Sequence, residues 1–224
     1  MFTKLLEGVD KKLVRNLVIL HTLVIAVSNY LAGPAFHLSL FPGWNNPILG
    51  DFEIMAAAFT FPIVVVATDL TVRLVGKQAG RAVVALAVIP AIIGSVLVIG
   101  LTGAPWEIAQ RIGIASGVAY GIGTMLDVYV FQYVREKYSE AWWAAPAIST
   151  IAANFIDTYA FVLTAFPGEI GLAFNQTMVK VVVGLIVFLP TYGLLLSFLK
   201  DKVDVGLAPK EEAPKKRGRK KKTS

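Results

Sequence analysis

The chain has 224 residues, of which 56% are hydrophobic and only 16% are charged. A soluble domain carries about 25% charged residues, so this composition argues against a soluble protein. The chain has no cysteine, which excludes disulfide bonds, thiolate metal sites and cysteine nucleophiles. Its two histidines, His21 and His37, are too few to favour a histidine-built metal site. We therefore expect neither a bound metal nor a cofactor.

Long apolar runs alternate with short polar breaks along the chain, and crossing a bilayer takes about 20 apolar residues. The sequence predicts an all-α bundle of six transmembrane helices, at residues 14–33, 52–74, 82–102, 107–131, 144–165 and 177–199. Together these form one transmembrane domain over residues 14–200. The preceding segment, 1–13, is basic and amphipathic and is expected to lie along the membrane surface. The first helix is not a signal peptide, because its apolar stretch is too long and no small-x-small cleavage site follows.

The basic residues are distributed unevenly among the segments between these helices. Nineteen of the 21 lysine and arginine residues fall at the two chain ends and in the loops near 73–81 and 132–143. The loops at 34–51, 103–106 and 166–176 contain none. Because basic residues are retained on the cytoplasmic side, this alternation predicts that both termini face the cytoplasm.

The last segment, 201–224, is strongly basic and of low complexity, and is predicted to be disordered. In a soluble protein the net charge of +6 would suggest nucleic acid as a partner. Here most of the excess charge lies in this tail, so no nucleic-acid partner is expected. Two interpretations of the tail stay open: contact with anionic lipid head groups, or a solvated segment without a partner, which is favoured.

The candidate intramembrane charges in the predicted helices are Asp69, Arg73, Arg111, Asp127, Asp157 and Lys180, whereas Glu53 and Glu107 lie near the outer ends of their helices and can reach water. A charge at mid-bilayer costs at least about 2.5–3.5 kcal/mol, so it normally faces the bundle interior and has a partner. Arg111 and Lys180 lie about one turn inside the outer edge, where a long side chain can reach water. Asp157 lies nearest the middle of its helix and has no such route. It is therefore the best candidate for a functional residue.

Asp157 belongs to a polar stripe on the fifth helix, with Asn154, Thr158 and Phe161 at helical spacing. An amide, a carboxylate, a hydroxyl and an aromatic ring suit a flat heterocycle that carries N–H donors. The alternative is a polar clasp between helices. Further polar stripes comprise Tyr120, Thr124 and Asp127 on the fourth helix, and His21, Ser28 and Asn29 on the first.

Three glycines on the fourth helix, Gly113, Gly117 and Gly121, are spaced i, i+4, i+8. Small residues at this spacing allow two helix backbones to approach closely. We interpret them as a packing signal rather than as part of a site.

An intramembrane protease is the rival class of function. Ser116 lacks the Gly-x-Ser-x motif of rhomboid-like enzymes, and Asp127 lacks the Gly-x-Gly-Asp run of intramembrane aspartyl proteases. No phosphate-binding loop is present either. A carrier for a small polar solute is therefore favoured over an enzyme, and protonation of a buried aspartate could couple it to a proton gradient.

The residues quoted above resemble the queuosine precursor transporter family, the vitamin-uptake-like (VUT) transporters of bacteria. The resemblance covers about residues 14–200. It rests on Thr68–Arg73, Arg111 ahead of Leu126–Phe131, Asn154 to Phe161, Lys180 ahead of Leu189–Gly193, His21 with Ser28–Tyr30, and Trp142–Pro146.

This resemblance implies import of 7-cyano- or 7-aminomethyl-7-deazaguanine across the bacterial cytoplasmic membrane, for salvage into the queuosine of tRNA. An alternative is a solute-binding subunit of an energy-coupling-factor vitamin transporter, which would need a separate ATPase. The sequence leaves open whether the carrier is a homodimer. The candidate substrate-binding residues are Asn29, Asp69, Arg73, Arg111, Asp127, Asn154, Asp157, Phe161 and Lys180.

Overall fold

A computed structural model of the chain describes residues 6–33, 36–39, 45–46, 50–51, 53–138 and 141–200. The predicted tail at 201–224 lies outside the described residues, as do the first five residues and most of the loop at 34–51. Six helical segments are long and apolar enough to cross a membrane. The prediction of an all-α bundle with six spans is therefore confirmed.

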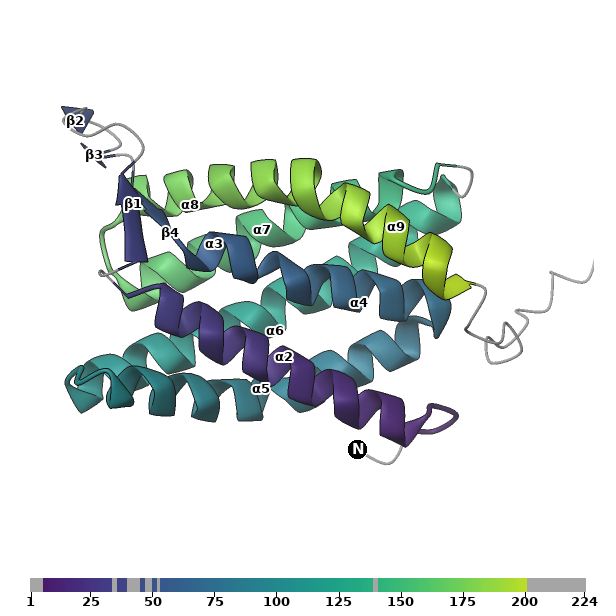
Figure 1. Cartoon of the computed structure of the whole chain (residues 1–224), viewed down its shortest axis with the longest axis horizontal. Helices are drawn as coiled ribbons and strands as arrows, with labels where there is room; N and C mark the ends of the chain where they lie inside the picture. The colour runs from purple at the N-terminus through teal and green to yellow at the C-terminus, as the bar shows by residue number, and fades with distance from the viewer. Residues whose placement is uncertain are drawn as a thin grey trace, which may run out of the picture.

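The helices run back and forth along one common direction (Figure 1). The first five spans are α2 (Lys11–Leu31), α3 with α4 (Ala57–Thr60 and Pro62–Leu74), α5 (Lys77–Leu101), α6 (Trp106–Lys137) and α7 (Ala144–Ala165). The sixth consists of α8 (Ile170–Val183), the π-helical turn η2 (Gly184–Phe188) and α9 (Leu189–Lys200). The side chain of Asp10 caps the start of α2 by accepting hydrogen bonds from the backbone N–H groups of Lys12 and Leu13.

Four helix boundaries differ from the prediction by at least five residues, one of them the start of α5, which lies at Lys77 rather than at 82. The second span begins at Ala57 rather than at 52, because residues 53–55 form a strand. Helix α6 continues to Lys137 rather than 131, and α8 begins at Ile170 rather than 177. Hydropathy detects the part of a helix that lies in hydrocarbon, whereas backbone hydrogen bonding sets where the helix begins and ends.

Two short antiparallel strand pairs occupy the connection between α2 and α3. Strand β1 (His37–Ser39) pairs with β4 (Glu53–Met55), and β2 (Asn45–Asn46) pairs with β3 (Gly50–Asp51). The β1–β4 pair leads directly into α3, so it fixes where the second span begins.

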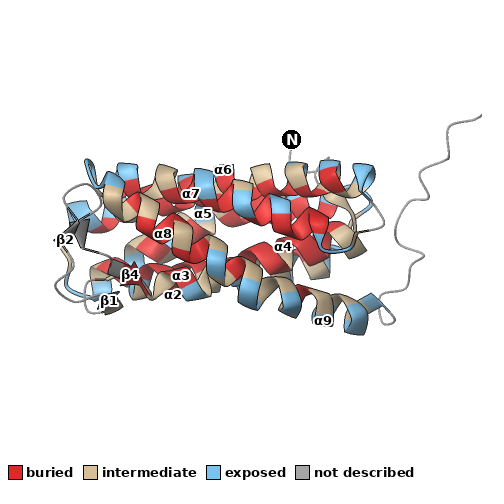
Figure 2. Ribbon diagram, turned by 90° about the horizontal axis from the view of Figure 1, so that it is seen from above, coloured by how far each residue is buried: buried red, intermediate tan, exposed pale blue. Residues whose placement is uncertain are grey.

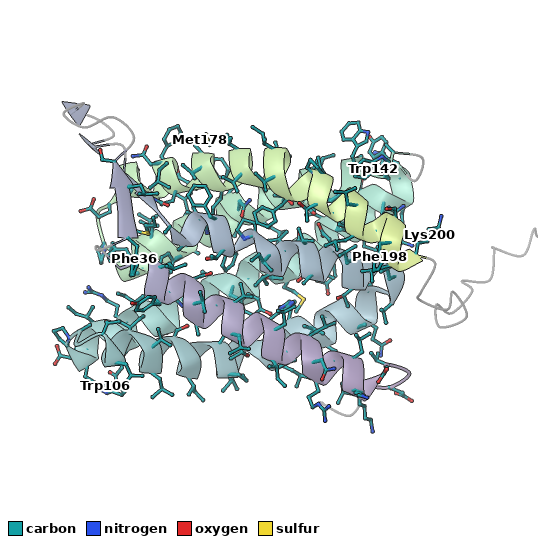
Figure 3. All side chains as sticks on the ribbon, viewed as in Figure 1. Phe36, Trp106, Trp142, Met178, Phe198 and Lys200 are labelled. Atoms are coloured by element: carbon teal, nitrogen blue, oxygen red, sulfur yellow. The ribbon has the colours of Figure 1, made fainter. Side chains whose placement is uncertain are left out.

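The two ends of the bundle differ in chemistry. The start of α2 and the end of α9 lie together at one end, here called the terminal end, and the strands lie at the opposite, loop end (Figure 1). The helices place these basic residues toward the terminal end: Lys11, Lys12, Arg15, Arg73, Lys77, Arg81, Arg135, Lys137 and Lys200. Exposed tryptophans occur at both ends, with Trp106 at the loop end and Trp142 beside Lys200 at the terminal end (Figure 3). Such aromatic belts are typical of membrane interfaces.

The three glycines of α6 form the contact with α5, as predicted. A Cβ atom at Gly113 would collide with Val96, one at Gly117 with Ile92, and one at Gly121 would come within 3.2 Å of Val88. The partners on α5 descend in steps of four while the glycines ascend in steps of four. This is the register of two closely packed antiparallel helices.

Burial separates an inner polar face from an outer apolar one. Buried residues concentrate on the sides of the helices that face one another, and exposed residues lie on the outward sides (Figure 2). Many exposed residues are large and apolar, such as Leu23, Ile89 and Ile93. The buried set includes Asp69, Asp127 and other costly polar side chains. Apolar residues outside and charges inside are the arrangement expected in lipid.

Candidate functional site

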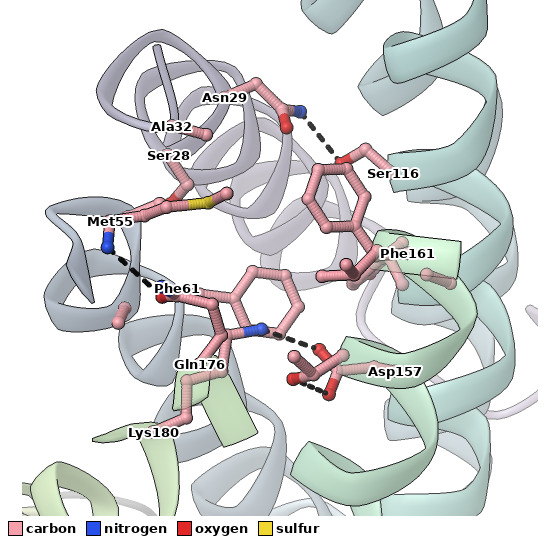
Figure 4. Close-up of a pocket in the computed structure, with 16 residues that line it drawn as sticks. Ser28, Asn29, Ala32, Met55, Phe61, Ser116, Asp157, Phe161, Gln176 and Lys180 are labelled. Carbon is pink, nitrogen blue, oxygen red and sulfur yellow. Dashed lines mark hydrogen bonds and ion pairs between the residues drawn. The ribbon is translucent and has the colours of Figure 1, made fainter. Parts of the chain in front are cut away.

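A pocket opens among α2, α3, α6, α7 and α8 in the half of the bundle nearest the strands; we call it the loop-end pocket (Figure 4). Its polar lining comprises Ser28, Asn29, Ser116, Tyr120, Asp157, Thr158, Gln176 and Lys180. The helices bring these side chains together from four spans that are far apart in the sequence. Asn29, Asp157, Phe161 and Lys180 are the four candidate residues that line this pocket.

An ion pair between Asp157 and Lys180 lies at the centre of the lining. The Lys180 Nζ atom is 3.3 Å from Asp157 Oδ2, and the hydroxyl of Thr158 donates to Asp157 Oδ1 at 3.2 Å. Both charged side chains are almost fully buried. Because α8 begins at Ile170, Lys180 lies nearly three turns from the start of its helix rather than about one turn inside it. The structure therefore pairs Lys180 inside the bundle instead of directing it to the membrane surface.

Two aromatic rings line the pocket, one of them directly against this ion pair. Phe61, at the junction of α3 and α4, lies under the ammonium group, with Lys180 Nζ 4.5 Å from the ring centroid. Phe161 lies one turn beyond Asp157 on α7 and lines the same pocket (Figure 4). Cation–π contact stabilises the ammonium in a region with little water. The rings also supply the flat apolar walls that a planar solute requires.

Asn29 joins three helices at the side of the pocket. Its Nδ2 atom donates to Ser95 Oγ at 2.6 Å and to Ser116 Oγ at 2.8 Å. Both N–H groups of the amide are therefore used. Its Oδ1 atom makes no hydrogen bond among the described residues. Asn29 thus joins helices through hydrogen bonds and also lines the pocket, so it fits both interpretations of a buried polar residue.

Gln176 and Tyr120 line the pocket but were not among the candidates. The Oε1 atom of Gln176 accepts a hydrogen bond from the backbone N–H of Met55 at 3.2 Å, which ties α8 to strand β4. Gln176 was missed because the sixth span was predicted to begin at 177. The Tyr120 hydroxyl lies 2.8 Å from His21 Nδ1. Tyr120 and His21 belong to polar stripes that are visible in the sequence, but their pairing follows only from the packing of α2 on α6.

The pocket is narrow in this conformation. The cavity volume is about 40 Å³, which is room for about three water molecules. A bicyclic base is larger than this space. The walls must therefore separate before such a solute enters.

Asp69 and Asp127 lie deeper, toward the terminal end, and do not line the loop-end pocket. Asp69 on α4 and Asp127 on α6 are close enough for their charges to interact, and so are Asp127 and Asp157; we call such pairs electrostatic neighbours. Their exposed fractions are 1% and 0%. Neither Asp127 oxygen nor Asp69 Oδ1 has a hydrogen-bond partner among the described residues. Asn154, one turn from Asp157 on α7, is likewise buried with both amide atoms unpartnered in the described chain.

A second, wider cleft opens at the terminal end, and we call it the terminal-end vestibule. Its volume is about 1060 Å³, and its lining includes Arg73, Arg135, Trp142 and Trp143. Arg73 therefore lies at this mouth rather than in the pocket. Tyr192 is an electrostatic neighbour of Asp69 as well as of Arg73 and Arg135, so it lies between the buried carboxylates and the vestibule.

Arg111 is placed apart from all the other candidates. It is exposed, and it shares a helical stripe with the exposed residues Ile114, Val118 and Ile122 on the outward side of α6. It lines neither the pocket nor the vestibule. Its long side chain is consistent with reaching the membrane surface from a position near the loop end.

The protease alternative gains no support from this geometry. Ser116 accepts a hydrogen bond from Asn29, and His21 pairs with Tyr120. No hydrogen bond joins Ser116 to His21 among the residues that the structure describes. A serine nucleophile would need such a bond to its base.

Known proteins with similar sequences are membrane transporters by name. A family model described as "Putative vitamin uptake transporter" matches residues 55–195. The "Queuosine precursor transporter" of Escherichia coli (strain K12) is 34% identical over 200 residues, which are 80% of this chain and 84% of that protein. The "Probable queuosine precursor transporter" of Haemophilus influenzae is 30% identical over 210 residues, 83% of this chain and 87% of that protein. No solved structure matches the chain.

The family match covers the pocket lining from Met55 to Lys180 and therefore the contributions of α3, α6, α7 and α8. The relatives extend the similarity over 80–83% of the chain. With its six apolar spans and its buried polar interior, the chain is a multi-pass membrane protein that belongs to the vitamin uptake transporter family.

Proposed function

We propose that this chain imports queuosine precursors, the deazaguanine bases that carry a cyano or aminomethyl group, across the bacterial cytoplasmic membrane. The names of the two relatives support this substrate class. The observation that carries the proposal is the Asp157–Lys180 ion pair in the loop-end pocket, which Phe61 and Phe161 also line. It provides an acceptor and a donor side by side, in the place where a flat base would enter.

The hydrogen-bonding edge of a guanine-like base matches these two side chains. A ring N–H and an exocyclic amine lie next to each other, and one carboxylate can accept from both. The adjacent ring carbonyl needs a donor, which the Lys180 ammonium supplies with the protons not directed at Asp157. Oxygen Oδ1 of Asn29 is a further acceptor at the rim. The 7-cyano base is neutral and binds to a neutral ion pair, so it adds no net charge to the membrane interior.

The aromatic rings give the site its preference for planar solutes. A base that enters between Phe61 and Phe161 stacks on a ring face, an interaction worth about 1–3 kcal/mol per base. The ring of Phe61 is already held by Lys180. Because the loop-end pocket has a volume of only about 40 Å³ in this conformation, binding of a base requires that the helices lining the pocket move apart.

The distribution of basic residues supports an orientation with the terminal end in the cytoplasm. The loop-end pocket then faces the outside of the cell, and the terminal-end vestibule is its exit. A solute taken from outside would pass first between the aromatic rings and then along the buried polar residues. Import follows from this order of sites.

The test is uptake of a radiolabelled deazaguanine by the purified chain in proteoliposomes that contain no other protein. We expect saturable uptake by the wild-type chain, inhibited by unlabelled 7-cyano-7-deazaguanine and not by adenine, whose edge lacks the N–H and amine pair. The Asp157→Asn variant should lose uptake, because an amide cannot accept from both donors.

Glu107→Gln provides a matched control, because Glu107 is an exposed acid at the start of α6. Its uptake should equal that of the wild type. Absence of both binding and uptake by the wild-type chain would refute the substrate assignment. Uptake that appears only when an ATPase module is added would instead support the energy-coupling-factor alternative.

A further inference from the structure

Two buried carboxylates in the middle of the bundle form no ion pair with a cation of the described residues. Asp69 and Asp127 have exposed fractions of 1% and 0%, they lie close enough to interact electrostatically, and the Ser149 hydroxyl lies near both. Three of their four oxygen atoms nevertheless make no hydrogen bond within the described ranges. The solute pocket does not use them, because they line neither its walls nor its entrance.

The cations of the bundle are directed elsewhere. Lys180 pairs with Asp157, and Arg135 donates to the backbone oxygen of Val72 at 3.3 Å. Arg73 lines the terminal-end vestibule, and Arg111 is exposed on the outward side of α6 near the loop end. Of the three carboxylates and three cations that are candidate intramembrane charges, only Asp157 and Lys180 therefore form an ion pair among the described residues.

Unpartnered polar groups surround a small cavity beside this carboxylate pair. Asp69, Tyr192 and Gly184 line a space of about 10 Å³, which is room for about one water molecule. The Tyr192 hydroxyl has no hydrogen-bond partner in the described chain, and its side chain is 1% exposed. Asn154, whose amide is also unpartnered there, adjoins Gly184, with its Nδ2 atom 3.7 Å from the position of a Cβ atom.

Two neighbouring carboxylates in a dry interior cannot both be ionised without a large electrostatic cost. One proton shared between them removes this cost, since the protonated carboxyl can donate to its neighbour. A divalent metal ion is a poorer occupant, because no group of three or more histidine, cysteine, aspartate or glutamate residues in the described chain could hold one. Buried acids of this kind in membrane proteins form proton relays.

We propose that Asp69 and Asp127 together hold a transported proton, and that its passage to the terminal-end vestibule drives solute import. The proposal deepens the proposed function and rests on it. The proton forms one O–H bond with a carboxylate oxygen and leaves it for water in the vestibule. No bond of the solute is made or broken. Coupling follows because Asp127 is an electrostatic neighbour of Asp157, which holds the solute.

Two titratable groups interact with the pair directly: Asp157 on α7 is close to Asp127, and Tyr192 on α9 is close to Asp69. Other titratable and charged groups on the bundle helices include His21 on α2, Arg73 on α4, Lys77 and Arg81 at the start of α5, Tyr120 and Arg135 on α6, and Lys180 on α8. His21 is bonded to Tyr120, and Lys77 and Arg81 lie over the ring of Tyr129. Asp157 and Tyr192, on either side of the pair, are the groups placed to pass a proton to and from it.

The test uses the purified full chain in proteoliposomes that contain a pH-sensitive dye. Addition of 7-cyano-7-deazaguanine outside should acidify the lumen in wild-type vesicles, and a more acidic external buffer should accelerate uptake. The Asp127→Asn variant should lose both effects, while Asp127→Glu should restore solute-driven acidification. Glu107→Gln, on the same helix, should behave as the wild type. Elution as a single peak in size-exclusion chromatography would show that each variant is folded.

Each other outcome has a distinct meaning. Wild-type uptake without acidification, unchanged when the pH gradient is reversed, would overturn proton coupling and leave the import proposal standing. Uptake that follows a sodium gradient instead would assign the pair to sodium. Acidification by Asp127→Asn equal to that of the wild type would overturn the assignment of these residues. Absence of both uptake and binding in the wild type would refute the import proposal itself.

Discussion

Gly123 on α6 packs directly against Asp157 on α7, because a Cβ atom at position 123 would overlap the Cβ atom of Asp157. The backbone oxygen of Ala153 lies within 3.5 Å of the same position. The close approach of α6 and α7 therefore fixes where the pocket carboxylate can stand. Any side chain at 123 displaces that carboxylate.

Substitution Gly123→Ala should lower uptake by moving Asp157 away from Lys180. Overpacking of this kind costs about 1–3 kcal/mol, and it falls on the ion pair itself. Gly94→Ala is the matched control, since a Cβ there makes ordinary contacts of 3.7 Å with Ala26 and Thr22. Initial uptake rates in vesicles, normalised to folded protein, measure the difference. Equal rates for the two variants would contradict the packing argument.

The Asp157–Lys180 pair should show strong coupling in a double-mutant cycle. Removing one partner leaves a buried charge and costs about 3–5 kcal/mol, so Lys180→Met and Asp157→Asn should each lower the melting temperature in detergent. The double variant should melt higher than either single variant and still fail to take up solute. Lys200→Met, at the end of α9, should leave the melting temperature unchanged. Additive losses would show that the two charges stand alone.

Phe161→Leu should weaken binding while leaving the fold intact. Loss of base stacking of about 1.4 kcal/mol raises the KM for uptake about tenfold. Phe155→Leu, on the same helix, removes an exposed ring that stacks on Tyr159 instead. Its KM should match that of the wild type. Concentration-dependent uptake of labelled base gives both values, and a similar change in the two would point to a general effect on α7.

Arg111→Gln should leave uptake within about twofold of the wild type, as for a surface substitution that breaks no contact. Arg111 is exposed and lies outside both clefts. The sequence makes it a candidate only because it falls inside an apolar run. Uptake in cells that cannot make the base provides the measurement, and a severe loss would return Arg111 to the transport path.

Gln176→Leu should loosen the junction between α8 and strand β4. The backbone N–H of Met55 would lose its acceptor, and a buried unsatisfied N–H costs about 1–3 kcal/mol. Melting temperature in detergent should fall, whereas Gln132→Leu near the terminal end should have little effect. An unchanged melting temperature for Gln176→Leu would mean that water replaces the lost acceptor.

The sequence predicts the number of spans and the costly polar residues, because both depend on hydrophobicity alone. Asp157, Phe161, Lys180 and Asn29 were found in this way and line one pocket. Which residues meet depends on how helices rotate about their axes. A lipid-facing stripe and a helix-facing stripe are both apolar, so hydropathy leaves this rotation undetermined.

Arg111 and Lys180 show this limit most clearly. Both are single cations in apolar runs, and both appeared to lie about one turn from an outer edge. One is exposed on the outward side of α6, and the other is buried 3.3 Å from a carboxylate. The seven residues of α8 before the predicted start account for the difference in depth. The spacing of the glycines, by contrast, predicts a close helix contact directly. The structure identifies α5 as the helix that packs there.

The π-helical turn at Gly184–Phe188 divides the last span into two arms. The first arm, α8, carries Gln176 and Lys180 to the loop-end pocket, while the second, α9, carries Pro190 and Gly193 to the terminal-end vestibule. A widened turn followed by a proline is a place where a helix can bend. Because Gly184 of this turn lies beside the buried Asp69, we expect α8 and α9 to tilt independently about that point, each changing the width of its own opening.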